Sequence, residues 1–258
     1  MKNGRLKKNL ISAACVAFWL IVWQIAAMLL SMKIKNLHVL LASPTEVAVR
    51  LWELIQTADF LKSLMFSLVR ILGGFFLGLA IGTGLAALSG KIMFFRRLFA
   101  PLISAVKSIP VASFTILALM WISSKNLSVL ISVLIAIPIV YSNMLEGIDS
   151  LDPKLKTMAD IFRIPAGKRF IGVYLSQLLP YFRSACRLAM GLCWKSGIAA
   201  EVIGMPDGSI GEKLFMSKVY LETADLFAWT LVIILLSFVC EKLFMALVDF
   251  TVRRVERM

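Results

Sequence analysis

The residues best suited to chemistry in this sequence are charged side chains that lie within or near long apolar runs. Charge inside an apolar span is costly, so such a residue marks a functional site by default. Arg183 and Arg187 are four positions apart and would share one face of a helix. We expect these two arginines, with Lys195 and Glu201, to lie along a path for a polar solute, and the cations to attract a small anion.

A structural interpretation of the same charges competes with this one. Near the end of an apolar run, long charged side chains often extend to the membrane surface instead of binding a ligand. In this interpretation Lys195 neutralises Glu201, and Lys242 neutralises Glu241 or Asp249. The sequence leaves both interpretations open.

Signatures of catalysis and metal binding are nearly absent. His38 is the only histidine, and no second histidine or acidic cluster lies near it in the sequence, so it is a poor general base or metal ligand. The chain lacks the Gly-x-x-x-x-Gly-Lys-Ser/Thr sequence of P-loop ATPases. No two of the four cysteines have the spacing of metal ligands. We therefore predict no enzymatic activity, no metal and no cofactor.

Composition indicates an integral membrane protein. Of the 258 residues, 60% are apolar and only 17% are charged, and the mean hydropathy is +0.87. Soluble domains have about 45–50% apolar and about 25% charged residues, so this excess cannot fit inside one soluble core. The net charge of +13 is explained by basic loops that face anionic lipid, and we predict no nucleic-acid partner.

Apolar runs predict an all-α, polytopic fold with six transmembrane helices, at about 20 residues per span. Gly74, Gly78 and Gly82 are spaced by four and would let a neighbouring helix approach closely. Prolines within the runs, namely Pro110, Pro138 and Pro180, are candidate bends or gates. The predicted spans cover residues 10–32, 64–90, 98–124, 126–145, about 170–194 and 226–247.

The distribution of Lys and Arg predicts the orientation. An even number of spans puts both termini on one side, and the segments on that side contain 15 Lys and Arg against 7 on the other. Cytoplasmic loops carry the excess of positive charge, so both termini are predicted to be cytoplasmic in a plasma membrane. The predicted organisation is a cytoplasmic N-terminus (1–9), a first span with an external amphipathic segment (10–63), a five-helix core (64–248) and a cytoplasmic tail (249–258).

The segment 152–164 has the pattern of a short amphipathic helix on the cytoplasmic face. Asp152 and Pro153 form a strong helix start, and Pro165 and Gly167 are expected to end it. Such a helix can lie on lipid or insert into a groove of a partner protein, and the pattern leaves both open. Its apolar stripe consists of Leu155, Met158, Ala159 and Phe162.

Three stretches carry a family resemblance. Residues 179–182 read Leu-Pro-Tyr-Phe, residues 187–194 read Arg-Leu-Ala-Met-Gly-Leu-Cys-Trp, and residues 199–204 read Ala-Ala-Glu-Val-Ile-Gly. Together they resemble the membrane permease of binding-protein-dependent ABC importers, in the nitrate/sulfonate/taurine branch. The resemblance extends over roughly 41–244 and implies the bundle of a type I importer permease.

The signature of that family is a cytoplasmic Glu-Ala-Ala, three residues, Gly, nine residues and Ile-x-Leu-Pro. At that spacing only Ala159 and Leu175 match outright, and the acidic residue, the glycine and the proline are replaced. The resemblance nevertheless implies that this segment contacts the ATPase. The residues expected to make or shape that contact are Leu155, Thr157, Met158, Ala159, Asp160, Phe162, Arg163, Pro165 and Gly167.

What the resemblance implies is transport without catalysis in this chain. The expected partners are cytoplasmic ABC ATPase subunits, an extracytoplasmic substrate-binding protein, a second copy of the permease and the lipid bilayer. ATP-driven closure of the ATPase would move the short cytoplasmic helices and open the path alternately to each side. The solute would be small and anionic, such as a sulfonate, nitrate or taurine. An ion-coupled secondary transporter, a membrane enzyme and a scaffold subunit are the rival classes.

Overall fold

The computed structural model describes residues 2–33 and 41–255, and His38 lies outside them. The described part is helical and contains no strand, which confirms the all-α prediction. The elements in order are α1 (Lys2–Lys33), α2 (Pro44–Ile55), α3 (Ala58–Lys91), α4 (Met93–Ser108), α5 (Val111–Ala118), α6 (Ser124–Asp149), α7 (Pro153–Ile161), α8 (Ala166–Arg169), the π-helix η2 (Phe170–Leu175), α9 (Ser176–Gly204), α10 (Ile210–Val219) and α11 (Thr223–Val255).

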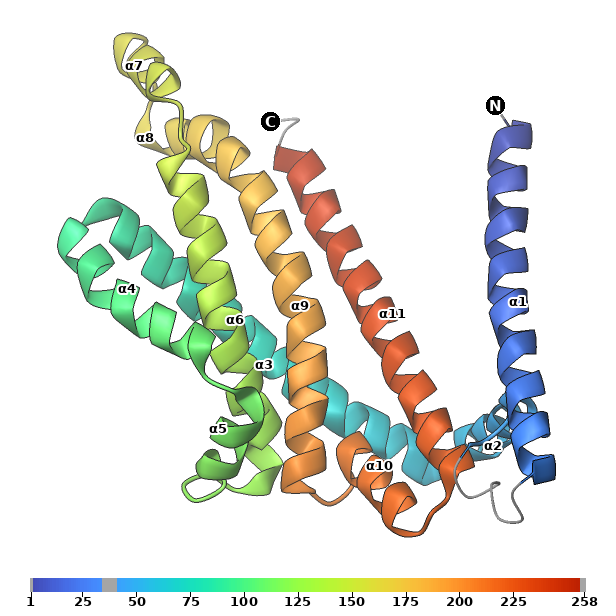
Figure 1. Cartoon of the computed structure of the whole chain (residues 1–258). Coiled ribbons are helices and arrows are strands. Elements are labelled where there is room, and N and C mark those ends of the chain that lie inside the picture. The colour runs from blue at the N-terminus through green and yellow to red at the C-terminus, as the bar shows by residue number, and fades with distance from the viewer. Residues whose placement is uncertain (1, 34–40, 256–258) are drawn as a thin grey trace.

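Helix α6 is the centre of the bundle. Its two most extensive interfaces are with α3, which crosses it obliquely, and with α9, while α11 packs on α2, α9 and α10 (Figure 1). The most apolar stretch of α6 is 50% buried inside the chain, whereas that of α11 is only 17% buried. An apolar helix with so little protein around it needs lipid around it, so α11 lies at the periphery.

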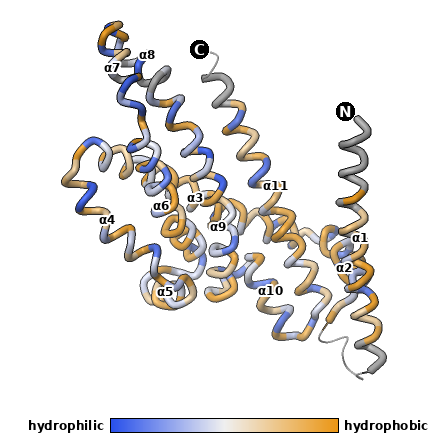
Figure 2. Tube along the Cα trace, turned by 45° about the horizontal axis from the view of Figure 1, so that its top comes forward, coloured by the Kyte–Doolittle hydropathy of each residue, from blue (hydrophilic) through white to orange (hydrophobic). Residues whose placement is uncertain are grey.

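Different short helices lie at the two ends of the bundle. Both ends of the described chain lie at the same end of the bundle as α7 and α8, and α2, α5 and α10 lie at the opposite end (Figure 1). This arrangement agrees with a chain that starts and finishes on the side of the 152–164 segment. Figure 2 shows hydrophobic residues along most of the long helices between these two ends.

Not all six predicted spans pass a test of length and composition. Within the described residues, α3, α6 and the stretch Thr223–Phe250 of α11 are long and apolar enough to cross a membrane, and α4 with α5 forms a bent fourth candidate. The apolar part of α1, Ala17–Leu29, is shorter. The polytopic character is therefore confirmed, and the count of six remains a prediction.

Close packing of α3 on α6 follows from the glycines at every fourth position. A Cβ atom added to Gly74 would lie 2.5 Å from the carbonyl oxygen of Val129, and one added to Gly78 would lie 2.4 Å from the Cβ of Ala136. These distances leave no room for a side chain, so the small residues bring the two backbones together. The predicted close approach is confirmed.

The three prolines behave differently from one another. Pro110 stands at the start of α5, where the axis turns by 98° between α4 and α5. Pro138 is buried within α6, and Pro180 lies within α9, and each of these helices runs through its proline as one element. The only sharp break in a span among the described residues is thus the one at Pro110.

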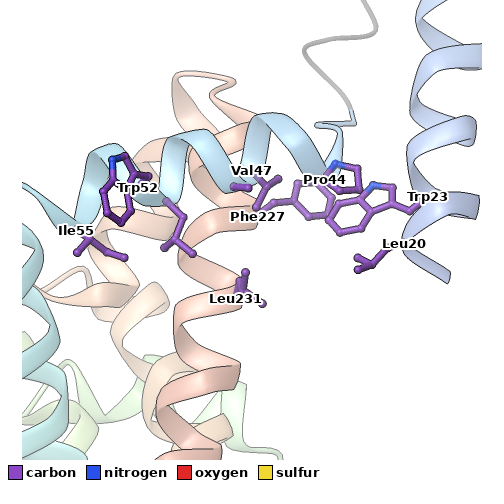
Figure 3. A pocket seen from close by; sticks show the side chains of 10 residues that line it. Leu20, Trp23, Pro44, Val47, Trp52, Ile55, Phe227 and Leu231 are labelled. Atoms are coloured by element: carbon purple, nitrogen blue, oxygen red, sulfur yellow. The ribbon is translucent and has the colours of Figure 1, made fainter. Parts of the chain in front are cut away.

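At the end opposite α7, helix α2 packs mainly on α11, on the side of α1 (Figure 1). Ser43 and Glu46 form a capping box at its start. Arg50 pairs with Asp225 of α11, with Nη2 donating to Oδ2 at 3.1 Å, and these hydrogen bonds raise the pKa of the Arg50 guanidinium. An apolar pocket of about 280 Å³ separates α2 and α11 from α1, and Figure 3 shows Trp23 reaching across it toward Phe227.

Candidate functional site

Helix α7 forms as the sequence predicts at its start. The Asp152 side chain accepts a hydrogen bond from the Lys154 amide at 2.8 Å, and Pro153 occupies the first turn, where a missing amide proton costs nothing. Figure 1 shows α7 projecting beyond α6 at the end of the bundle. The helix is therefore a short, well-defined element at the tip of the molecule.

The end of α7 differs from the prediction. The helix stops at Ile161 because Arg163 adopts a left-handed conformation with φ of 48°, and the Ile164 amide then donates back to the Ala159 carbonyl oxygen at 3.0 Å. Pro165 and Gly167 do not end it: α8 starts directly after Pro165, and Gly167 lies inside α8. The expectation that these two residues stop the helix was wrong, because an arginine, not a glycine, takes the left-handed position.

The predicted apolar stripe divides into two parts. Ala159 is buried and Leu155 half-buried, so these residues face the protein. Met158 is 41% exposed, and Ile161 and Phe162 are each 72% exposed. Ile161 was not among the candidates, because a stripe of positions i, i+3, i+4 and i+7 from Leu155 passes beside it. The exposed apolar surface of the tip is thus formed by Met158, Ile161 and Phe162.

A shallow groove runs along the same tip. It has a volume of about 370 Å³ and is lined by residues of α7 alone: Pro153, Lys154, Thr157, Met158 and Ile161. Thr157 and Asp160, like Arg163, are exposed around this surface. An exposed apolar patch with a polar rim on a projecting helix is typical of a contact surface for another protein.

Two hydrogen bonds connect α7 and its N-cap residue to the chain that follows it. The Asp152 amide donates to Gln177 Oε1 of α9 at 3.0 Å, and Arg169 Nη1 donates to Asp160 Oδ1 at 2.5 Å. The hydrogen bond to Asp160 raises the pKa of the Arg169 guanidinium. A force applied to α7 would therefore reach α6 through the short connection after Asp149 and α9 through Gln177.

The end of α6 is held in turn by the start of α4. Arg96 forms two hydrogen bonds to the Asp149 carboxylate, with Nη1 donating to Oδ1 at 2.9 Å. The planar guanidinium fixes the orientation of the carboxylate in such a fork. Motion of α7 would therefore also reach α4, which leads to the break at Pro110.

The arginines proposed for a solute path are paired with acids. Arg183 Nη2 donates to Asp249 Oδ2 of α11 at 2.8 Å, and Arg187 Nε lies 3.9 Å from Glu241 Oε1. Both pairs tie α9 to α11. The structure therefore favours the structural interpretation of these charges. The cations that pair with Asp249 and Glu241 are Arg183 and Arg187 and not Lys242, whose Nζ lies over the Phe238 ring.

Glu201 is buried where α3, α9 and α10 meet. Ser67 Oγ donates to Glu201 Oε2 at 2.6 Å, the Gly211 amide donates to the same oxygen at 3.4 Å, and the Ile210 amide donates to Ser67 Oγ at 3.0 Å. Glu201 is not paired with Lys195, which is exposed on α9. The carboxylate therefore joins three helices, and the structure does not bring the four path candidates together in one site.

Comparisons with known proteins identify the family. The model of the binding-protein-dependent transport system inner membrane component matches residues 74–257. The chain is 24% identical over 228 residues to a putative aliphatic sulfonates transport permease of Bacillus subtilis, covering 88% of this chain and 79% of the relative. It is 23% identical over 222 residues to the nitrate import permease of Synechococcus elongatus, covering 82% of this chain and 77% of the relative.

A third relative is the bicarbonate transport system permease of Synechococcus elongatus, which is 24% identical over 227 residues, covering 85% of this chain and 81% of the relative. The family match extends over most of the helical core, from α3 to α11. The family is one of transport permeases, which confirms that the chain is not a catalytic enzyme. The chain belongs to the family of binding-protein-dependent transport system inner membrane components.

Proposed function

We propose that this protein is the permease subunit of an ATP-binding-cassette importer, and that α7 is the element through which partner ATPase subunits drive it. The observation that carries the proposal is the exposed apolar surface of Met158, Ile161 and Phe162 on a helix that projects past the bundle. Exposing these side chains to water is unfavourable, and burial in a partner's groove removes that cost.

Transmission of the ATPase motion follows from the attachments of α7. Closure of two ATPase subunits on ATP displaces α7, and the short connection to α6 together with the Gln177 bond to α9 carries the displacement into the bundle. The Arg96–Asp149 pair carries it into α4. The path between two permease copies then opens to one side and closes to the other.

The class of solute and the orientation belong to the same proposal. The relatives named above transport sulfonates, nitrate and bicarbonate, which share a negative charge and oxygen atoms that accept hydrogen bonds. We assign a small oxyanion as solute, delivered by a binding protein that docks at the end of α2, α5 and α10. The end of α7 and both termini then face the cytoplasm of a plasma membrane.

The docking of α7 is tested by co-purification of the tagged permease with its ATPase. Replacing both Met158→Asp and Phe162→Asp places two charges in the buried part of the proposed interface, so we expect at least about a tenfold loss of bound ATPase. The matched control replaces Val219→Asp and Tyr220→Asp, which are 55% and 70% exposed at the opposite end. The control should retain the ATPase, and full retention by the α7 variant would place the docking site elsewhere.

A further inference from the structure

A lysine, Lys107, lies at the break between α4 and α5 and is separate from the α7 surface described above. Lys107 is the penultimate residue of α4 and directly precedes the 98° turn at Ile109 and Pro110. Its Nζ donates to Ser142 Oγ of α6 at 2.7 Å. Arg96, Arg183 and Arg187 each lie next to a carboxylate, whereas no carboxylate among the described residues pairs with Lys107.

The exposed side of α4 is mixed, with polar side chains in one sector and the apolar Leu98 and Leu102 in another. Arg97, Ser104 and Ser108 lie within a narrow sector of α4 and are all exposed. Lys107 lies beside this sector, four residues after the buried Ile103, where α4 meets α6. Figure 2 shows hydrophilic residues recurring along α4 between hydrophobic ones. An exposed ammonium group in one half of a bent span, next to a polar sector, is unfavourable against lipid.

The backbone at the α4–α5 break also indicates that this surface does not face lipid. Pro110 is exposed and Ile109 is half-buried, so the non-helical segment is not covered by its own bundle. At membrane depth, irregular backbone is tolerated only where protein or a water-filled path surrounds it. Both figures place α4 and α5 on the flank of α6 opposite to α11, so the α4 flank is distinct from the lipid-facing surface of α11.

We propose that Lys107 is a binding contact for the transported oxyanion, on a water-filled face formed by α4, the α4–α5 break and Ser142. The inference rests on the proposed function, because the solute is the one that this permease would move. The ammonium supplies a positive charge, and the Ser142 hydroxyl holds it in place and offers a further donor to the anion. A lysine suits this role because it attracts an oxyanion without the geometric demands of a guanidinium.

The local field at the break is tested by cysteine modification, which needs no transported solute. Ser108→Cys is introduced together with Cys15→Ser and Cys240→Ala, since Cys186 and Cys193 are fully buried. The full-length permease in lipid vesicles is treated with an anionic and a cationic methanethiosulfonate reagent. We expect reaction with both, and a preference for the anionic reagent that falls by about fivefold when Lys107→Gln is added.

Two further variants make the modification experiment specific. Lys107→Arg keeps the charge and should keep the preference for the anionic reagent. Lys242 of α11 is exposed, and its ammonium group lies over the Phe238 ring. Lys242→Gln removes this cation and should leave the preference for the anionic reagent unchanged. If the thiol introduced by Ser108→Cys reacts with neither reagent until the protein is denatured, or if Lys107→Gln does not change the preference, the inference is overturned.

Transport distinguishes a solute contact from a contact with lipid phosphate. The assembled importer in vesicles is given nitrate, bicarbonate or a short alkanesulfonate, and uptake is measured at saturating and limiting concentrations. We expect Lys107→Gln to lower uptake at least about tenfold with ATPase subunits still bound, and Lys242→Gln to stay within about twofold of the unmodified protein. Unchanged uptake in Lys107→Gln overturns the inference, whereas failure of all three anions in the unmodified importer overturns the solute class of the proposed function.

Discussion

Charged side chains in the helices of this protein are held by a few specific partners, which are acids for two arginines and neutral donors for Glu201. Arg183 and Arg187 of α9 are paired with acids of α11, and Glu201 accepts hydrogen bonds from Ser67 and from the start of α10. Removing one partner of a buried polar pair leaves the other without compensation, which costs more than the pair itself contributes. The buried carboxylate should therefore be the residue at which the bundle is most sensitive to substitution.

We expect Ser67→Ala to lower the free energy of unfolding by about 1–3 kcal/mol, because Glu201 Oε2 and the Ile210 amide each lose a partner. Thermal unfolding of the purified permease in detergent measures the change. Thr230→Ala is the control, since its hydroxyl donates only to Leu226 of its own helix and is exposed, and we expect less than about 0.5 kcal/mol there. An equal effect of the two substitutions would show that the buried junction is not stabilising.

At the scale of elements, packing of α3 on α6 depends on which glycines face the partner. A Cβ atom at Gly78 would lie 2.4 Å from the Cβ of Ala136, whereas one at Gly84 would meet no atom within 4 Å. We expect Gly78→Ala to destabilise the protein by about 1–3 kcal/mol through overpacking. Gly84→Ala should instead stabilise it by up to about 1 kcal/mol, because alanine favours the helix. Thermal unfolding of both variants checks the opposite signs, and destabilisation by Gly84→Ala alone would contradict the assigned interface.

Regular spacings and cap residues in the sequence predicted some features, whereas an unusual backbone conformation and the partners of single side chains were missed. The spacing of Gly74, Gly78 and Gly82 predicts the close helix interface, and Asp152 with Pro153 predicts the start of α7. The end of α7 was missed because nothing in the sequence marks Arg163 as left-handed. The partners of Arg183 and Arg187 lie more than 50 positions away on α11, so their identity depends on how the helices pack.

In the whole molecule, α7 and both ends of the described chain lie at one end of a bundle, and apolar helices extend from there to the other end. The charge bias of the sequence predicts a cytoplasmic side for both termini, and α7 lies at the same end of the bundle as the ends of the described chain (Figure 1). This arrangement matters because the proposed drive from the ATPase requires α7, and not α10, to be on the side where ATP is present.

We expect Thr157→Cys on α7 to react with a membrane-impermeant maleimide only in inside-out vesicles, and Tyr220→Cys after α10 to react only in right-side-out vesicles. Both side chains are exposed at opposite ends of the bundle. Because a charged reagent does not cross the hydrocarbon core, the side of reaction reports the side of the residue. Cys15→Ser is included in both variants, since Cys15 is exposed. Reaction of position 157 from the outside would place α7 away from any cytoplasmic ATPase and remove the physical basis for coupling ATP hydrolysis to this bundle.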